Sequence, residues 1–323
     1  MSFSLRQASG LVLLCGLLHG PALAQPPAAG CPPVASAPTP EQVSAGVKAA
    51  RNHGFLWRLR KDGRVSWLYG TVHVARFEWM FPGPSITDAL RASDTIALEL
   101  DVLDPDIQQR MAQGAVATPG AATLPDALQR RLQRQAEAEC LPMQAIAALS
   151  PEMQVAALES LVGRRDGLDP SYGIDFVLAG WARSARKAVV SLETPELQLA
   201  TLTLATKDET AEFVDSALAE MEAGRAAPAL RRIAQVWADG DLETLSRYES
   251  WCDCVKTPAD RAALVRLLDE RNPGLADSIA ALHARGQRVF AAVGSLHMIG
   301  PLGLPALMAQ RGFAVEPVAF SRR

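Results

Sequence analysis

The sequence lacks an excess of positive charge. Its 323 residues include 32 Lys and Arg against 35 Asp and Glu, which gives a formal net charge of −3. Proteins that bind nucleic-acid phosphates or anionic lipid use surfaces rich in Lys and Arg, so this balance argues against a nucleic-acid partner. After residue 24, no apolar stretch approaches the roughly 20 residues of a spanning helix, and we expect no membrane span.

Several common catalytic motifs are also missing. The chain has no G-x-S-x-G nucleophile elbow, no H-E-x-x-H zinc helix, no phosphate-binding loop and no G-x-G-x-x-G dinucleotide turn. Histidine is scarce, with five in the whole chain. Any catalytic or metal site must therefore use few candidate residues in a less familiar arrangement.

The first 24 residues have the composition of a secretory signal peptide. Arg6 is their only charge, an apolar run covers residues 11–18, and Ala22-Leu23-Ala24 fits a small-residue cleavage site. We predict cleavage after Ala24 and a periplasmic or secreted protein. A lipoprotein is disfavoured because Leu14, which is not a small residue, precedes Cys15.

The remaining chain has the composition of a globular protein. Apolar residues make up 49% of the sequence and charged residues 21%, enough for a real core. Residues 25–44 are rich in Pro and Ala and predict an extended leader. A folded domain over residues 45–320 follows this leader.

Four cysteines remain after signal cleavage: Cys31, Cys140, Cys252 and Cys254. An even number in an oxidising compartment favours disulfides. Because a bridge between cysteines only two residues apart strains the geometry, we expect Cys252 or Cys254 to pair with Cys31 or Cys140. The alternative is a metal site at the Cys-x-Cys pair, although no third ligand lies nearby in the sequence.

Both ends of the folded domain show the same succession of elements. Near the start, a hairpin over 55–69 leads into Gly70-Thr71-Val72-His73, a loop, a helix over 85–92 and a strand over 95–100. Near the end, a strand over 288–293 leads into Gly294-Ser295-Leu296-His297, a loop, a helix over 302–310 and a strand over 313–318. Such units form parallel pairs with right-handed crossovers.

The middle of the chain is mostly helical, with one strand over 188–192. Apolar spacing near 3.6 predicts helices over residues 125–140, 151–162, 174–185, 208–224, 226–237, 242–250 and 258–271. The predicted fold class is therefore α/β. It has a mixed sheet, parallel strand-helix-strand units at both ends of the chain, and a helical insertion over about 105–168.

His73 and His297 are the first candidates for chemistry. Each follows a strand, and ligands and catalytic groups gather at strand ends in open α/β sheets. Gly70 and Gly294 would let the chain turn sharply, so that each imidazole points into the crevice. G-x-x-H alone is a weak signal, and the matched setting of the two copies strengthens it.

Buried carboxylates form the second group of candidates. Glu99 lies in an apolar strand and needs a cation, a hydrogen bond or a metal, unless it reaches solvent at the strand end. Asp101 follows on the same face, where it serves the site or caps a helix. Glu193 ends a buried strand, where either Thr194 or Glu193 can cap the next helix, and capping is the ordinary role of Glu193. Arg271 is expected to close a helix before Pro273 and interact with its dipole.

Four segments resemble the TraB/GumN family, also called the TraB/Tiki superfamily. They are FLWRLRKDGRVSWLYGTVHV, TIALELD, YGIDFVLAGWARSARKAVVSLETPELQLATL and RNPGLADSIAALHARGQRVFAAVGSLHMIGPLGLPALMAQRGFAVEPV. The resemblance covers nearly all of residues 45–320. The paired G-x-x-H ends, the E-x-D strand, the L-E-T-x-E-x-Q segment and the R-N pair occur in family order.

The resemblance implies an α/β fold related to erythromycin esterases and ChaN-like proteins. For animal Tiki members it also implies a metal-dependent peptidase activity that uses the two histidines and the acidic strand residue. Carried onto this sequence, the metal or catalytic set is His73, Glu99 and His297. Glu193 and Arg271 are supporting polar residues.

The leading hypothesis is an exported metal-dependent hydrolase, foremost a peptidase. Two neutral imidazoles and one carboxylate suit a divalent ion such as Mn, Co, Fe or Zn, and Arg271 would steady a developing oxyanion. One alternative is a metal-independent, esterase-like hydrolase in which a His with a Glu partner activates water. Another is a non-catalytic protein that binds a peptide or small ligand. The sequence names neither the substrate nor the oligomeric state.

Overall fold

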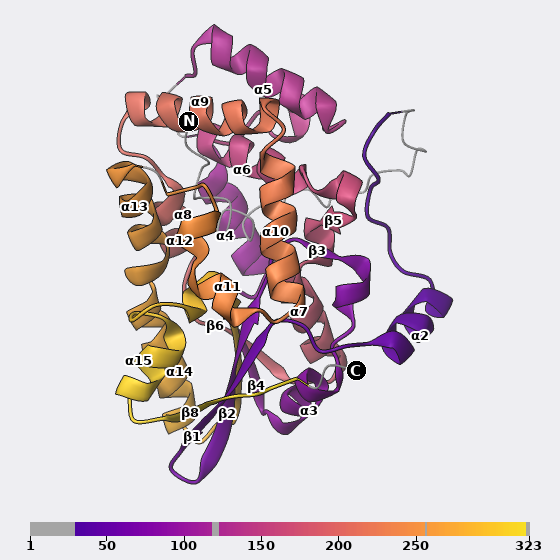
Figure 1. Cartoon of the computed structure of the whole chain (residues 1–323), viewed down its shortest axis with the longest axis vertical. Coiled ribbons are helices and arrows are strands. Elements are labelled where there is room, and N and C mark those ends of the chain that lie inside the picture. Colours follow the sequence, from indigo (N-terminus) through magenta and orange to yellow (C-terminus); the bar gives the residue numbers. More distant parts are fainter. Residues whose placement is uncertain (1–29, 118–122, 256, 321–323) are drawn as a thin grey trace.

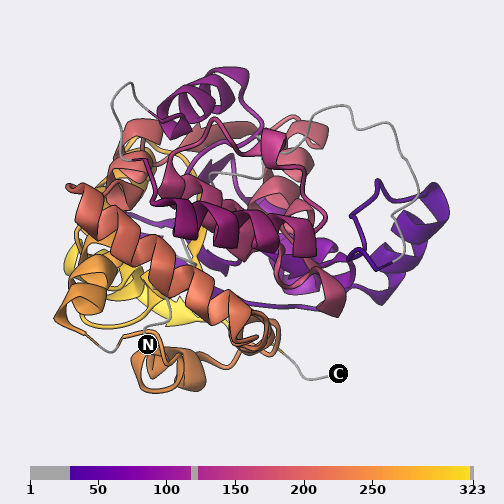
Figure 2. The same ribbon diagram turned by 90° about the horizontal axis from the view of Figure 1, so that it is seen from above.

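The computed structural model describes residues 30–117, 123–255 and 257–320. The predicted signal peptide lies outside these residues. The predicted leader, residues 25–44, is not extended throughout. Helix α2 (Pro40–Ala49) begins within it, after a capping box at Thr39, and continues past the predicted domain start at residue 45. This helix has no buried residue and lies at the margin of the molecule in both Figure 1 and Figure 2. Among the described residues, no helix has the length and apolar character needed to cross a membrane.

A mixed sheet of six strands forms the base of the molecule, in the order β6-β4-β7-β2-β1-β8. Strands β6, β4, β7 and β2 are parallel neighbours, whereas β1 runs antiparallel to both β2 and β8. The bounds are β1 (Phe55–Lys61), β2 (Arg64–Thr71), β4 (Thr95–Leu98), β6 (Ala188–Ser191), β7 (Val289–Gly294) and β8 (Ala314–Pro317). A separate ribbon pairs β3 (Ala75–Arg76) with β5 (Leu168–Asp169). The predicted mixed α/β class is confirmed.

The predicted hairpin is β1 and β2, paired from Phe55 opposite Gly70 to Lys61 opposite Arg64. Asp62 and Gly63 have φ of 49° and 70°, as a tight two-residue turn between twisted strands requires. The hairpin tip lies at the bottom of Figure 1. The carboxyl ends of β2 and its parallel neighbours therefore point toward the helices at the top of that view.

The strand-helix-strand units occur at both ends of the chain, but their strands are not paired as predicted. β2 and β4 both pair with β7, which lies between them, and β8 pairs with β1. Strand β7 is buried along almost all of its length, with only its last residue partly exposed. Such a strand needs a neighbour on each side and cover on both faces, which is why β7 takes the central place.

Helices cover the sheet on both faces. Figure 1 shows α14 and α15 on one side of the strands and α3 and α7 on the other. A second group of helices packs above the sheet around its own small core, which takes residues from α4, α5, α6, α8 and α9. The bounds are α3 (Pro84–Ala92), α4 (Pro105–Ala115), α5 (Asp126–Ala138), α6 (Pro151–Leu161), α7 (Ile174–Ser184), α8 (Pro195–Leu202), α9 (Lys207–Glu222), α10 (Ala226–Ala238), α14 (Asn272–Ala284) and α15 (Leu304–Gln310).

Two predicted helices differ from the structure. The segment 242–250 divides into α11 (Leu242–Ser246) and α12 (Tyr248–Trp251), and the segment 258–271 contains α13 (Pro258–Leu264) and a π-helix, η6 (Val265–Asp269). Arg271 does not close a helix before Pro273, because this proline lies in the first turn of α14. Proline suits a first helical turn, where its missing N–H has no partner to lose.

The predicted disulfide between the two halves of the chain is wrong. Cys31 pairs with Cys140, and Cys252 pairs with Cys254, with Cα atoms 5.7 and 5.1 Å apart. Asp253 takes a φ of 55°, which turns the chain between the two neighbouring cysteines. Their Cα separation falls in the ordinary disulfide range as a result. The first bridge still ties the leader to the end of α5.

Candidate functional site

Parallel strand ends bring the predicted site residues together. Glu193, Glu99, His297 and His73 follow β6, β4, β7 and β2, which is also the order of the strands across the sheet. Because these strands point the same way, their carboxyl ends meet at one edge. Arg271 reaches this edge from the start of α14 and contacts Glu99, Glu193 and His297. All five predicted residues therefore lie in one buried cluster.

The two motif glycines differ from the prediction in their role. Neither Gly70 nor Gly294 has a positive φ, so neither makes a turn that only glycine permits. A Cβ on Gly294 would instead lie 3.2 Å from Glu99 Oε1, 3.4 Å from His73 Nε2 and 3.6 Å from His297 Cδ2. The missing side chain leaves a small space that three of the predicted site residues border.

His73 is held by a carboxylate that the sequence did not single out. Its Nδ1 donates to Asp175 Oδ2 at 2.6 Å, and Thr71 Oγ1 donates to Asp175 Oδ1 at 3.1 Å. Nε2 faces Glu99 Oε1 at 3.9 Å. Burial opposes the charged form of His73, but Asp175, with Glu99, outweighs this effect and raises its pKa. The Asp175 carboxylate on Nδ1 thus makes the His73 imidazole more basic.

His297 has a neutral partner and a cation beside it. Its Nδ1 donates to Asn272 Oδ1 at 2.6 Å, and the Asn272 amide is oriented by its own donation to Leu302 O at 2.8 Å. The other nitrogen, Nε2, lies 3.5 Å from Arg271 Nη1. Burial, followed by the Arg271 guanidinium, lowers the pKa of His297 to about 3. This histidine is therefore neutral at physiological pH.

Arg271 joins two buried carboxylates. Its Nη2 donates to Glu99 Oε2 at 2.8 Å and also to Glu193, while Nε donates to Glu193 Oε2 at 3.0 Å. Gln198 donates to both carboxylates. Burial raises the pKa of Glu193, whereas Glu99 has Arg271, the two histidines and the Gly294 N–H to offset its burial, and its pKa falls to about 2. Glu99 is therefore ionised.

Asp175, Asn272 and Gln198 are the site residues that sequence reasoning missed. Asp175 is buried in the first turn of α7, two residues after Gly173, and a carboxylate in an otherwise apolar turn is a recognisable signal. Asn272 follows Arg271 and is likewise buried. Glu193 does not cap α8, because Thr194 accepts from Leu197 N and fills that role. Asp101 lies outside the cluster and pairs with Arg183.

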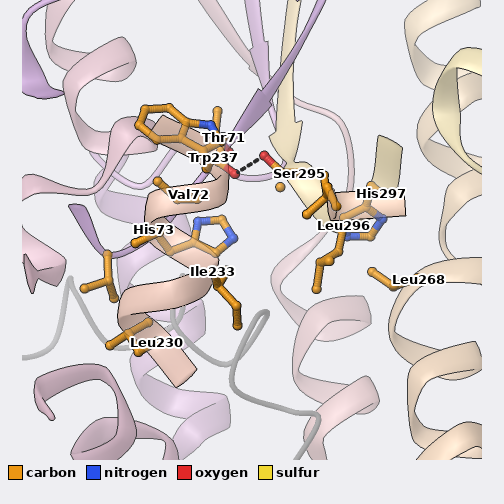
Figure 3. A pocket seen from close by; sticks show the side chains of 14 residues that line it. Thr71, Val72, His73, Leu230, Ile233, Trp237, Leu268, Ser295, Leu296 and His297 are labelled. Carbon is orange, nitrogen blue, oxygen red and sulfur yellow. Dashed lines mark hydrogen bonds between the residues drawn. The ribbon is translucent and has the colours of Figure 1, made fainter. Parts of the chain in front are cut away.

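A cavity opens beside the two histidines (Figure 3). His73 and Ile233 lie on one side of it, and Leu296, Leu268 and His297 lie on the other. Helix α10 covers it with an apolar face that includes Leu230, Ala234 and Trp237, whose indole Nε1 donates to Gly70 O at 2.7 Å. The imidazoles of His73 and His297 therefore border a small cavity with mostly apolar walls.

The residue types at the site fit a divalent metal. Both imidazoles have their Nδ1 anchored, as metal-binding histidines usually do, and Gly294 leaves space among His73, His297 and Glu99. Gln198 Oε1 is buried without a hydrogen-bond partner in the described part of the chain. As the side chains lie, however, the described residues contain no group of three His, Cys, Asp or Glu arranged to hold an ion. Arg271 occupies the position next to Glu99 and His297.

The TraB/PrgY/gumN family model matches residues 55–317. The chain belongs to this family. The matched segment contains the whole sheet from β1 to β8 and all five predicted site residues. No curated protein and no solved structure matches the chain. The likeness to erythromycin esterases and ChaN-like proteins therefore stays a prediction.

Proposed function

We propose that this TraB/PrgY/gumN protein is a hydrolase that attacks an acyl carbon, with a peptide as the first substrate class. The observation that carries the proposal is the pair of His73 and Asp175. An imidazole with a carboxylate on Nδ1 and its Nε2 facing a cavity has the geometry of a general base. The raised pKa of His73 suits proton removal from water.

The other side chains have complementary roles in this proposal. Arg271 carries a buried positive charge next to the site and stabilises the oxyanion that forms when a carbonyl is attacked. Glu99 and Glu193 balance that charge and hold the guanidinium in place. His297, neutral and fixed by Asn272, directs an unprotonated nitrogen toward Arg271.

We further propose a metal-bound form of this hydrolase, in which His73, Glu99 and His297 would hold a divalent ion, with Mn, Co, Fe and Zn as the candidates. Because Asp175 occupies Nδ1 of His73, Nε2 would be the ligand atom, and His73 would not be the base in this form. When bound, such an ion supplies Lewis acidity and lowers the pKa of water. Asp175 and Asn272 would orient the two imidazoles toward it, and Glu99 would contribute the charged ligand. The residue set, two imidazoles and one carboxylate, is common to all four metals.

A metal-independent hydrolase is the second candidate, and one contact favours it. Arg271 Nη1 lies 3.5 Å from His297 Nε2, so a fixed cation already faces one of the proposed ligands. In this version His73 alone takes the proton from water, and Arg271 provides the positive charge at the reacting carbonyl.

Elemental analysis and chelation test the metal proposal. We expect purified protein, never exposed to chelator, to contain about one divalent ion per chain, and His73→Ala and His297→Ala to lose it. Chelation should lower both the melting temperature and hydrolysis of a peptide library, and the matching ion should restore both.

Three outcomes separate the functions. Hydrolysis that survives chelation and needs His73 would support the metal-independent enzyme. Metal loss that abolishes hydrolysis would support the metallohydrolase. Absence of turnover with peptide, ester and amide libraries, with or without added ions, would contradict both and leave a ligand-binding protein.

Export from the cytoplasm is also part of the proposal. The N-terminal segment has the composition of a signal peptide, and the structure contains two disulfides, which are typical of oxidising compartments. N-terminal sequencing of the secreted or periplasmic protein should begin at Gln25. A mature chain that begins at Met1 would contradict it.

A further inference from the structure

Apart from the two histidines, the cavity is lined mostly by hydrocarbon. Apolar side chains from α10, α11, the π-helix η6 and the second G-x-x-H segment line it: Leu230, Ile233, Ala234, Trp237, Leu245, Leu268 and Leu296. Among the residues that the structure describes, no Asp, Glu, Lys or Arg lines this cavity. The two hydroxyls at its rim belong to Thr71 and Ser295, and Ser295 Oγ donates to Thr71 O at 2.8 Å. A charged group placed there would find few polar partners.

Helix α10 is held in place relative to the first G-x-x-H segment, residues 70–73. Trp237 Nε1 donates to Gly70 O at 2.7 Å, and Trp237 O accepts from Gly54 N at 2.9 Å. Leu230, Ile233 and Trp237 recur at helical spacing on the face toward the cavity (Figure 3). The position of this apolar face relative to His73 is therefore set by two hydrogen bonds through Trp237, one from its indole and one to its main-chain oxygen, as well as by packing.

The cavity is small. Its volume is about 60 Å³, and a single water needs about 10–15 Å³ on this scale. The space therefore takes a group of about four to six non-hydrogen atoms. An isopropyl or isobutyl group fits within this limit, whereas a phenyl ring with its methylene exceeds it.

We infer that this cavity is a specificity pocket for one short branched aliphatic side chain of the substrate, and that Ile233 sets its size limit. The inference rests on the proposed hydrolase function, because it places that side chain next to the carbonyl that His73-activated water attacks. Ile233 is the suitable determinant because it is only partly buried and lines the cavity beside His73 (Figure 3). Its truncation enlarges the space without emptying the core.

A series of N-acetyl-X-p-nitroanilides tests the inference, with X as Ala, Val, Leu, Phe, Asp or Lys. We expect Val and Leu to have the highest kcat/KM, and Phe, Asp and Lys to be about ten-fold or more lower. Ile233→Ala should move the optimum toward Phe, chiefly through KM. Ile107→Ala is the matched control, since Ile107 is also partly buried but packs in the small helical core.

A binding measurement keeps this test separate from that of the hydrolase. The same six residues are offered as N-acetyl-X-amides, and the shift in melting temperature is recorded for wild type, Ile233→Ala and Ile107→Ala. A preference for Val and Leu that moves to Phe only in Ile233→Ala supports the pocket, even if no p-nitroanilide is cleaved. An unchanged order in Ile233→Ala, or tighter binding of the Asp or Lys amide, overturns it.

Discussion

His73 and His297 stand beyond neighbouring parallel strands, in the same G-x-x-H setting, yet their Nδ1 atoms meet different partners. Asp175 accepts from His73, whereas the amide oxygen of Asn272 accepts from His297. The pKa of His73 is raised, and that of His297 is lowered to about 3. The motif determines where each imidazole lies, and the partner behind it determines whether that imidazole holds a proton.

The charged neighbours of the two histidines also differ: a carboxylate lies near His73, and a guanidinium lies near His297. Glu99 Oε1 lies toward His73, while Glu99 Oε2 accepts from Arg271, which stands beside His297. One carboxylate thus favours protonation of the first histidine, and its own cation disfavours protonation of the second. A site with one basic imidazole and one that is neutral at physiological pH separates proton transfer from ligand or substrate orientation.

The variant with the largest expected effect is Asp175→Asn. It removes the difference between the two histidines by giving His73 an amide partner like that of His297. We expect the pKa of His73 to fall and kcat to drop about 10³- to 10⁴-fold, because the carboxylate no longer fixes the tautomer or stabilises the imidazolium. Titration of the His73 ring by NMR and a pH–rate profile measure the two effects.

Thr71→Val is the matched control for that variant, since Thr71 donates to the other oxygen of the same carboxylate. The variant removes the hydrogen bond that Thr71 Oγ1 donates to Asp175 but leaves His73 its charged partner, so activity should fall about ten-fold. Equal losses in Asp175→Asn and Thr71→Val would contradict a special role for the carboxylate.

The second prediction concerns pH and is made for the chelated protein. His297 has a pKa of about 3 in the folded state against an ordinary 6.5, so between these values the unfolded chain binds a proton that the folded chain does not. The contribution of His297 to the free energy of unfolding is therefore complete above pH 6.5 and falls by about 1.4 kcal/mol per pH unit as pH drops toward 3. Glu99, with a pKa of about 2 against 4.5, adds its own loss only below pH 4.5.

His73 acts in the opposite direction because its folded-state pKa is raised. Its contribution is present below pH 6.5 and is lost as pH rises through the folded pKa. Urea unfolding of wild type and His297→Gln between pH 4.5 and 6.5 isolates the second histidine. The slope should flatten in the variant, and two parallel curves would show that His297 does not titrate as described.

Much of the site could be predicted from local sequence. An apolar run that ends in G-x-x-H identifies a buried strand and the residue beyond it, and Glu99 stands out as a charge beside four buried strand residues. The histidine partners could not be predicted in this way. Asp175 lies 102 residues after His73, and Asn272 lies 25 residues before His297 at the far end of the preceding helix, so only tertiary packing brings them to Nδ1. The sequence therefore identified the imidazoles but not their charge states.

The errors have local causes as well. Pro273 suits the residue after a helix end and the first turn of a helix equally well, so the sequence alone does not show that Arg271 stands at the start of α14. The predicted disulfide is wrong because Asp253 takes a positive φ, which brings Cys252 and Cys254 together. The strand pairing failed because hydrophobic patterning shows that β7 is buried on both faces but not which strands flank it.

The third prediction uses the two motif glycines, which neither strain nor turn the chain. A Cβ on Gly294 would lie 3.2–3.6 Å from Glu99, His73 and His297, whereas a Cβ on Gly70 would lie 3.0–3.3 Å from Ser295, Met298 and Phe55. A methyl group at position 294 would therefore crowd the candidate reacting side chains, whereas one at position 70 would crowd side chains that pack around the strand end.

We therefore expect Gly294→Ala to lower kcat about ten-fold with little change in melting temperature. Gly70→Ala should cost about 1–2 kcal/mol of unfolding free energy, as overpacking does, and keep kcat per folded molecule. Kinetics and urea unfolding on the same two preparations measure both quantities. If Gly294→Ala loses stability and keeps its kcat, the space beside Gly294 is packing volume, and the point where Glu99 and the two histidines meet is not where the substrate reacts.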